Sequence, residues 1–72
     1  MAQGQSPTVR RRRLAAELRR IREQRGLTID QVSERMAWHP TKLSRIETGR
    51  RSAPPGDVRA LLELYEIAGD EA

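Results

Sequence analysis

Residues 28–49, TIDQVSERMAWHPTKLSRIETG, decide the fold of this chain. Thr28 and Gln31 have the spacing of a capping box, in which each side chain bonds to the backbone N–H of the other residue. Apolar residues follow them at helical spacing. The first half of the stretch therefore predicts a short helix over about 28–36.

The second half of the stretch predicts another short helix. Pro40 disfavours helical structure at His39 and suits the first position of a new helix. Gly49 can take the left-handed conformation that ends a helix. The result is a helix over about 40–48, joined to the preceding one by a tight turn, which is the arrangement of a helix-turn-helix.

Two further helices flank this pair. The stripe Leu14, Leu18 and Ile21 predicts a helix over about 9–25, and the stripe Val58, Leu61, Leu62 and Tyr65 predicts one over about 55–66. We expect an all-α domain of four short helices over residues 9–67, a disordered tail over 1–8 and a frayed end over 68–72. Packing these helices leaves no long apolar strip over.

Composition excludes several classes of protein. The chain has 72 residues, no Cys and one His, so disulfides and the usual zinc ligand sets are excluded. No apolar run is long enough for a transmembrane helix. No nucleophile with an activating base is visible, so we expect no enzyme activity and no cofactor. A cytoplasmic, nucleoid-associated protein that does not bind membranes is the expectation.

Charge divides the chain into two parts. Residues 1–51 carry 13 Lys and Arg against 5 Asp and Glu, a balance of +8. Residues 52–72 carry one Arg against five acids, a balance of −4. A basic body of this kind suggests a polyanionic partner.

The predicted helix over 40–48 has one polar face that propensity does not explain. On a helical wheel, Leu43, Ile46 and Glu47 fall on one side. The opposite side holds Thr41, Ser44, Arg45 and Thr48. Small polar residues around one Arg suit a surface that must approach the DNA major groove closely, where Arg can bind guanine O6 and N7. A plain solvated face is the alternative.

Glu47 lies on the apolar side of that helix, where an unpaired carboxylate is costly. Arg22 lies at the edge of the apolar stripe of the first helix. We predict an ion pair between these two residues, which would fix the angle of the helix over 40–48. Truncating either partner of such a buried pair should cost about 3 kcal/mol.

Other residues are candidates for phosphate contacts, whose task is positioning rather than base reading. Lys42, Arg50 and Arg51 flank the polar face. Arg10 and Arg11 begin a run of four Arg that either follows phosphates or the minor groove or is a solvated charge run. Trp38 is expected to fill the space between the two short helices.

The stretch RGLTIDQVSERMAWHPTKLSRIETGRR, residues 25–51, strongly resembles the phage-repressor/Cro-type helix-turn-helix of the Xre family of bacterial regulators. The stretch MAWHPTKLSRIETGRR followed by DVRALLELY resembles the actinomycete branch of that family. The resemblance covers about residues 10–67. It implies a lambda-repressor-like domain of four to five helices that binds operator DNA as a transcriptional regulator, usually as a dimer.

The resemblance also implies roles for individual residues. Matching the motif position by position gives the base-facing set His39, Pro40, Thr41, Ser44 and Arg45. Thr28 and Thr48 are further phosphate candidates, and the Arg–Glu tie of the family falls on Arg22 and Glu47. Ile29 departs from the family, which commonly has a Gln there to hold a phosphate.

The resemblance leaves the partner open in two respects. A homodimer is expected to form through a C-terminal region beyond this sequence. The alternative to DNA binding is a protein-interaction module, similar to an antitoxin, that binds a small partner protein.

Overall fold

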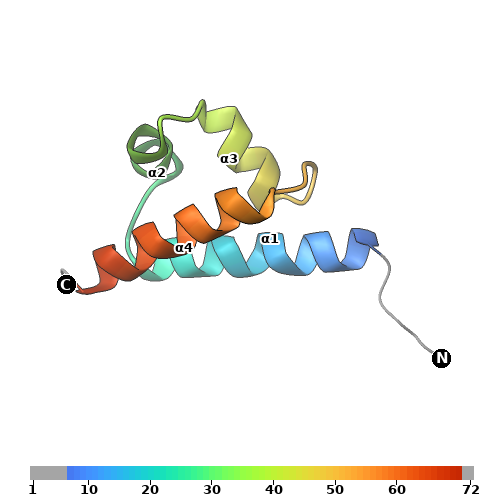
Figure 1. Cartoon of the computed structure of the whole chain (residues 1–72), viewed down its shortest axis with the longest axis horizontal. Coiled ribbons are helices and arrows are strands. Elements are labelled where there is room, and N and C mark those ends of the chain that lie inside the picture. Colours follow the sequence, from blue (N-terminus) through green and yellow to red (C-terminus); the bar gives the residue numbers. More distant parts are fainter. Residues whose placement is uncertain (1–6, 71–72) are drawn as a thin grey trace.

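The computed structural model describes residues 7–70, and all regular secondary structure in this part of the chain is helical. The helices are α1 (Pro7–Gln24), α2 (Ile29–Met36), α3 (Pro40–Glu47) and α4 (Pro55–Asp70). The helices α1 and α4 run beside each other, and the α2–α3 pair lies on one side of them (Figure 1). The predicted all-α helix-turn-helix fold is confirmed.

The helix ends follow the predicted capping residues. Thr28 caps α2: its Oγ1 accepts from the N–H of Gln31 at 3.0 Å, and the Gln31 Oε1 accepts from the N–H of Thr28 at 2.8 Å. Gly26 and Gly49 have φ values of +69° and +77°, the left-handed conformation that ends α1 and α3. The capping box and both glycine stops are therefore confirmed.

The turn between α2 and α3 contains a conformation that the sequence did not indicate. Ala37 has φ +58°, and it is the one residue other than glycine with positive φ in the described part of the chain. Its N–H bonds to the carbonyl of Glu34, and the N–H of Trp38 bonds to the carbonyl of Ser33 at 2.8 Å. These two bonds close α2 and turn the chain sharply into α3.

The buried apolar core draws on all four helices. It consists of Ala15, Leu18, Val32, Leu43, Ile46, Leu61 and Tyr65. Around it pack the half-buried Ile21, Leu27, Ile29, Met36, Trp38, Ala53 and Leu64. Trp38 thus lies half-buried at the rim of the core, and its predicted place between the two short helices stays a prediction.

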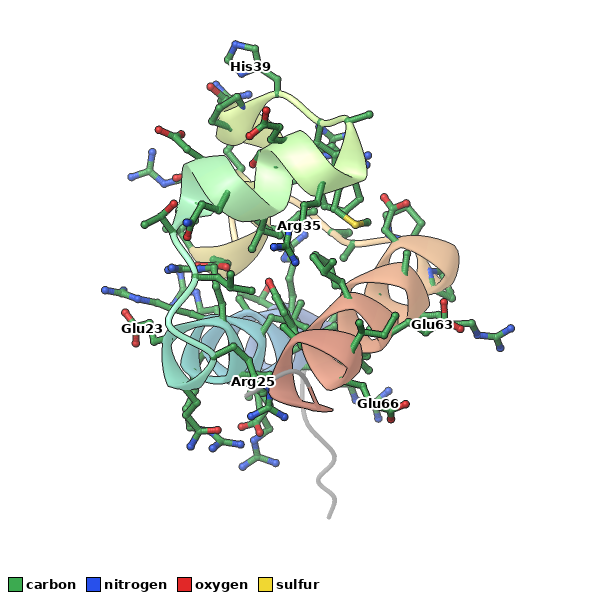
Figure 2. The ribbon with its side chains drawn as sticks, turned by 90° about the vertical axis from the view of Figure 1, so that its left-hand side faces the viewer. Glu23, Arg25, Arg35, His39, Glu63 and Glu66 are labelled. Carbon is green, nitrogen blue, oxygen red and sulfur yellow. The ribbon has the colours of Figure 1, made fainter. Side chains whose placement is uncertain are left out.

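Two helices are longer than predicted. Helix α1 begins at Pro7 rather than Val9, because proline is well suited to the first turn of a helix. Helix α4 continues to Asp70 rather than ending at residue 66. The Arg25 Nε donates to the Tyr65 carbonyl at 2.8 Å, and a Cβ on Gly69 would meet this guanidinium, so Arg25 packs along the last turns of α4 (Figure 2). Residues 1–6 of the predicted tail and 71–72 of the predicted frayed end lie outside the described residues.

The four helices leave some apolar surface exposed. Leu14 and Leu62 are 37% and 42% exposed, and with Val58 they line an open groove between α1 and α4. Leu14 leaves the core because the buried stripe of α1 passes through Ala15 instead.

Candidate nucleic-acid interface

The outer face of α3 presents the predicted polar surface. Thr41, Ser44, Arg45 and Thr48 are all exposed. On the opposite side Leu43 and Ile46 are almost fully buried. A shallow depression on the outer face is lined by Ile29, Pro40, Thr41, Ser44, Arg45, Thr48 and Arg50. The structure therefore brings four of the five predicted base-facing residues together, and their contact with bases stays a prediction.

His39, the fifth predicted base-facing residue, does not line this depression. Its Nδ1 accepts from the N–H of Thr41 at 3.1 Å, so the imidazole is the N-cap of α3. A ring nitrogen that accepts a hydrogen bond is unprotonated, which leaves only the opposite edge of the ring for a ligand. Figure 2 shows His39 at the tip of the molecule, beyond the helices.

Arg22 and Glu47 form the predicted ion pair and hold α3 on α1. The Arg22 Nε lies 2.8 Å from Glu47 Oε2, and its Nη2 lies 3.0 Å from Oε1. The third nitrogen, Nη1, donates to the Leu27 carbonyl at 2.7 Å. The two side chains are only 10% and 3% exposed, and the hydrogen bonds to Glu47 raise the pKa of Arg22.

This pair satisfies the conditions under which a buried ion pair is tolerated. Both carboxylate oxygens are bonded, and the guanidinium donates to three acceptors in a planar fork. The pair fixes α3 relative to α1 and to the turn before α2. The outer face of α3 is thereby held at a set angle.

The C-terminal end of α3 is closed by the backbone of the two following arginines. The N–H groups of Arg50 and Arg51 both donate to the Arg45 carbonyl, at 3.0 and 3.2 Å. The Thr48 hydroxyl also donates to this carbonyl, at 3.3 Å. The side chains of Arg50 and Arg51 remain exposed beside the outer face. The hydroxyl proton of Thr48, by contrast, is already donated to the Arg45 carbonyl.

A family model described as a helix-turn-helix domain matches residues 13–72. The chain belongs to this helix-turn-helix family. Among curated proteins no match was found, and among solved structures none was found either. The α2–turn–α3 pair is the helix-turn-helix of the family, and this membership indicates DNA binding.

Lys42 makes contacts within the protein, and its phosphate contact stays a prediction. Its Nζ lies 3.2 Å from Asp57 Oδ2 and 4.1 Å from the centre of the Trp38 ring. The side chain therefore ties α3 to the start of α4.

The arginine run likewise forms no extended arm in the described residues, because all four arginines belong to α1. The Arg11 Nη1 donates to the Ser52 hydroxyl at 3.3 Å. The Arg12 stem packs against Gly49. Arg10 is exposed on α1, beside Arg13 and Leu14 rather than beside α3. Arg11 is thus a structural contact to the loop after α3.

Thr28 stays a phosphate candidate. It is exposed at the start of α2, where its hydroxyl oxygen already accepts the capping bond. The neighbouring Ile29 is the residue that sequence reasoning missed, since it lies on the wall of the depression.

No group of His, Asp and Glu side chains within residues 7–70 is placed to hold a metal ion. None of the helices described is long and apolar enough to cross a membrane.

Proposed function

We propose that this helix-turn-helix domain binds double-stranded DNA sequence-specifically, with α3 in the major groove and with Thr41, Ser44 and Arg45 at the base edges. The observation that carries the proposal is the outer face of α3. It is exposed, it has small polar residues around one Arg, and it is held from behind by the Arg22–Glu47 pair. A rigid helix with this surface suits direct readout of bases.

Arg50 and Arg51 supply the phosphate contacts in this arrangement. Both follow α3 directly, and both side chains are exposed. Their backbone N–H groups are fixed on the Arg45 carbonyl, so their position is coupled to that of the reading residue. Contacts of this kind set the register of a protein on DNA and carry no sequence information.

A transcriptional regulator similar to the Xre family is the role that fits such a domain. Regulators of this kind bind near-palindromic operators as dimers, and we propose the same for the protein that carries this domain, in the cytoplasm on the nucleoid. The family match favours this role over the protein-interaction alternative. No catalytic activity is proposed.

The test is selection of bound duplexes from a random DNA pool with the 72-residue chain and with Arg45→Ala. The wild-type chain should enrich a half-site. Arg45→Ala should lower affinity for that half-site by about 1–3 kcal/mol and relax one base position. Arg51→Ala is the matched control, because it removes one Arg outside the base-reading set. It should weaken all sequences alike and flatten the salt dependence by about one unit.

Two results would contradict the proposal. If Arg45→Ala and Arg51→Ala lower the affinity for every duplex equally, Arg45 does not read a base. Binding that depends on salt alone, with no enriched half-site, would exclude sequence-specific recognition by this chain.

A further inference from the structure

Ile29 has an unusual place for an apolar residue in a candidate DNA-binding surface. It is the first residue of α2, and it is half-buried with one side packed against the core. Its other side lines the depression on the outer face of α3, together with Thr41, Ser44 and Arg45. Part of an aliphatic side chain thus lies among the proposed base-reading residues.

The depression on the outer face of α3 is lined by apolar groups and by cationic side chains. Ile29 and the Pro40 ring are apolar, and Thr41 adds a methyl group beside its hydroxyl. Arg45 and Arg50 are the cationic lining residues. The Ile29 side chain has no hydrogen-bond donor, so this side chain cannot hold a phosphate.

One feature of the major groove matches an apolar wall next to an arginine. Thymine presents a C5 methyl group there, whereas the other edge groups of the four bases are hydrogen-bond donors and acceptors. Guanine presents O6 and N7 to Arg. A base step that contains a guanine and a thymine would meet both parts of the depression.

We infer that Ile29 is a specificity-determining residue that reads the methyl group of a thymine near the guanine bound by Arg45. This inference rests on the proposed function. Because 5-methylcytosine carries the same methyl group at C5, the position should also distinguish methylated from unmethylated cytosine. The domain would then sense a methyl group in the major groove.

The experiment uses the half-site that the wild-type chain selects and replaces each thymine in turn by uracil. This change removes one methyl group and keeps every hydrogen-bonding group. At one position the replacement should weaken binding about three- to fourfold, the effect expected for one buried methyl group. In Ile29→Ala the same replacement should have no effect, while Arg45 still discriminates its base.

Stability is controlled with Ile29→Val and with modified DNA. Ile29→Val keeps most of the core contact and should halve the uracil effect, with thermal unfolding measured alongside. A duplex with cytosine at the sensitive position should bind more tightly when that cytosine is 5-methylated. This last measurement uses only the wild-type chain.

The outcomes separate this inference from the proposed function. If Ile29→Ala only lowers the melting temperature and keeps the uracil effect, Ile29 is a core residue and the inference is overturned. The inference would also be overturned if Arg45 reads the half-site and no uracil replacement in it changes the affinity. If no half-site is selected, the proposed function fails, and the inference fails with it.

Discussion

Tyr65 carries a hydroxyl group that the core leaves without a hydrogen bond. The residue is 1% exposed, and its hydroxyl has no hydrogen-bond partner among the described residues. Burial raises its pKa from 10 to about 12; the charge of Glu47 adds to this rise, and that of Arg22 opposes it. The fold therefore favours the neutral phenol.

Replacing this residue by Tyr65→Phe should leave stability unchanged or slightly higher at neutral pH, because it removes a buried polar group that lacks a partner. The pH dependence follows from the raised pKa. The contribution of neutral Tyr65 is fully present below pH 10 and is lost as the pH rises from 10 to about 12. Urea unfolding should show a loss of roughly 2 kcal/mol over this interval in the wild-type chain. Tyr65→Phe should lack it, and an identical decline in both proteins would contradict the assignment.

At the scale of single residues, the sequence predicts a contact when both residues interrupt the apolar pattern of their helices. Arg22 and Glu47 each place a charge on an apolar stripe, and each needed a partner, so their pairing could be predicted. The contacts of Arg11 with Ser52 and of Lys42 with Asp57 could not. Those side chains lie on polar faces. From the sequence alone, a charged residue on such a face looks the same whether it is solvated, binds DNA or contacts another part of the protein.

At the scale of secondary-structure elements, the two glycines that end α1 and α3 can be compared directly, because each ends a helix in the same backbone conformation. Gly26 and Gly49 both have positive φ. A Cβ on Gly26 would meet nothing within 4 Å, whereas a Cβ on Gly49 would lie 3.0 Å from the Arg12 Cγ. The end of α3 therefore needs glycine for its conformation and also for its close approach to α1.

Gly26→Ala should lower the free energy of unfolding by about 1 kcal/mol, the cost of the left-handed conformation. Gly49→Ala should cost about 1 kcal/mol more, because the added methyl group must displace Arg12. Chemical unfolding of both variants, and of each combined with Arg12→Ala, measures this difference. In the Arg12→Ala background the two glycine substitutions should cost the same. Equal costs in the wild-type background would show that α1 and α3 do not approach as closely as described.

The ends of the helices could be predicted where the residues that cause them are close in sequence, and could not where those residues are distant. The boundaries of α2 and α3 were predictable because their capping residues are adjacent in the sequence. The last turn of α4 was missed because it packs against Arg25, which is distant along the chain. The left-handed Ala37 was missed because alanine does not favour that conformation, so its residue type gave no signal for it.

At the scale of the whole molecule, two acids of α4 and the two arginines that follow α3 lie on different elements. Glu63 and Glu66 lie on α4, away from His39 (Figure 2), whereas Arg50 and Arg51 follow α3. The molecule measures 43 × 24 × 19 Å. Electrostatic interactions between exposed charges are screened over about 8 Å at physiological ionic strength and over about 30 Å at 0.01 M salt. Distant acids should therefore act on DNA only at low salt.

Two double variants of equal charge change test this separation. Arg50→Gln with Arg51→Gln should weaken DNA binding at least about tenfold at physiological salt and should flatten the salt dependence by about two units, because two phosphate contacts are lost. Glu63→Gln with Glu66→Gln should leave affinity unchanged at that salt and should strengthen binding only near 0.01 M. DNA titrations at both salt concentrations measure these effects. Equal and opposite changes at physiological salt would mean that net charge governs binding, in which case the phosphate contacts could not be assigned to the residues after α3.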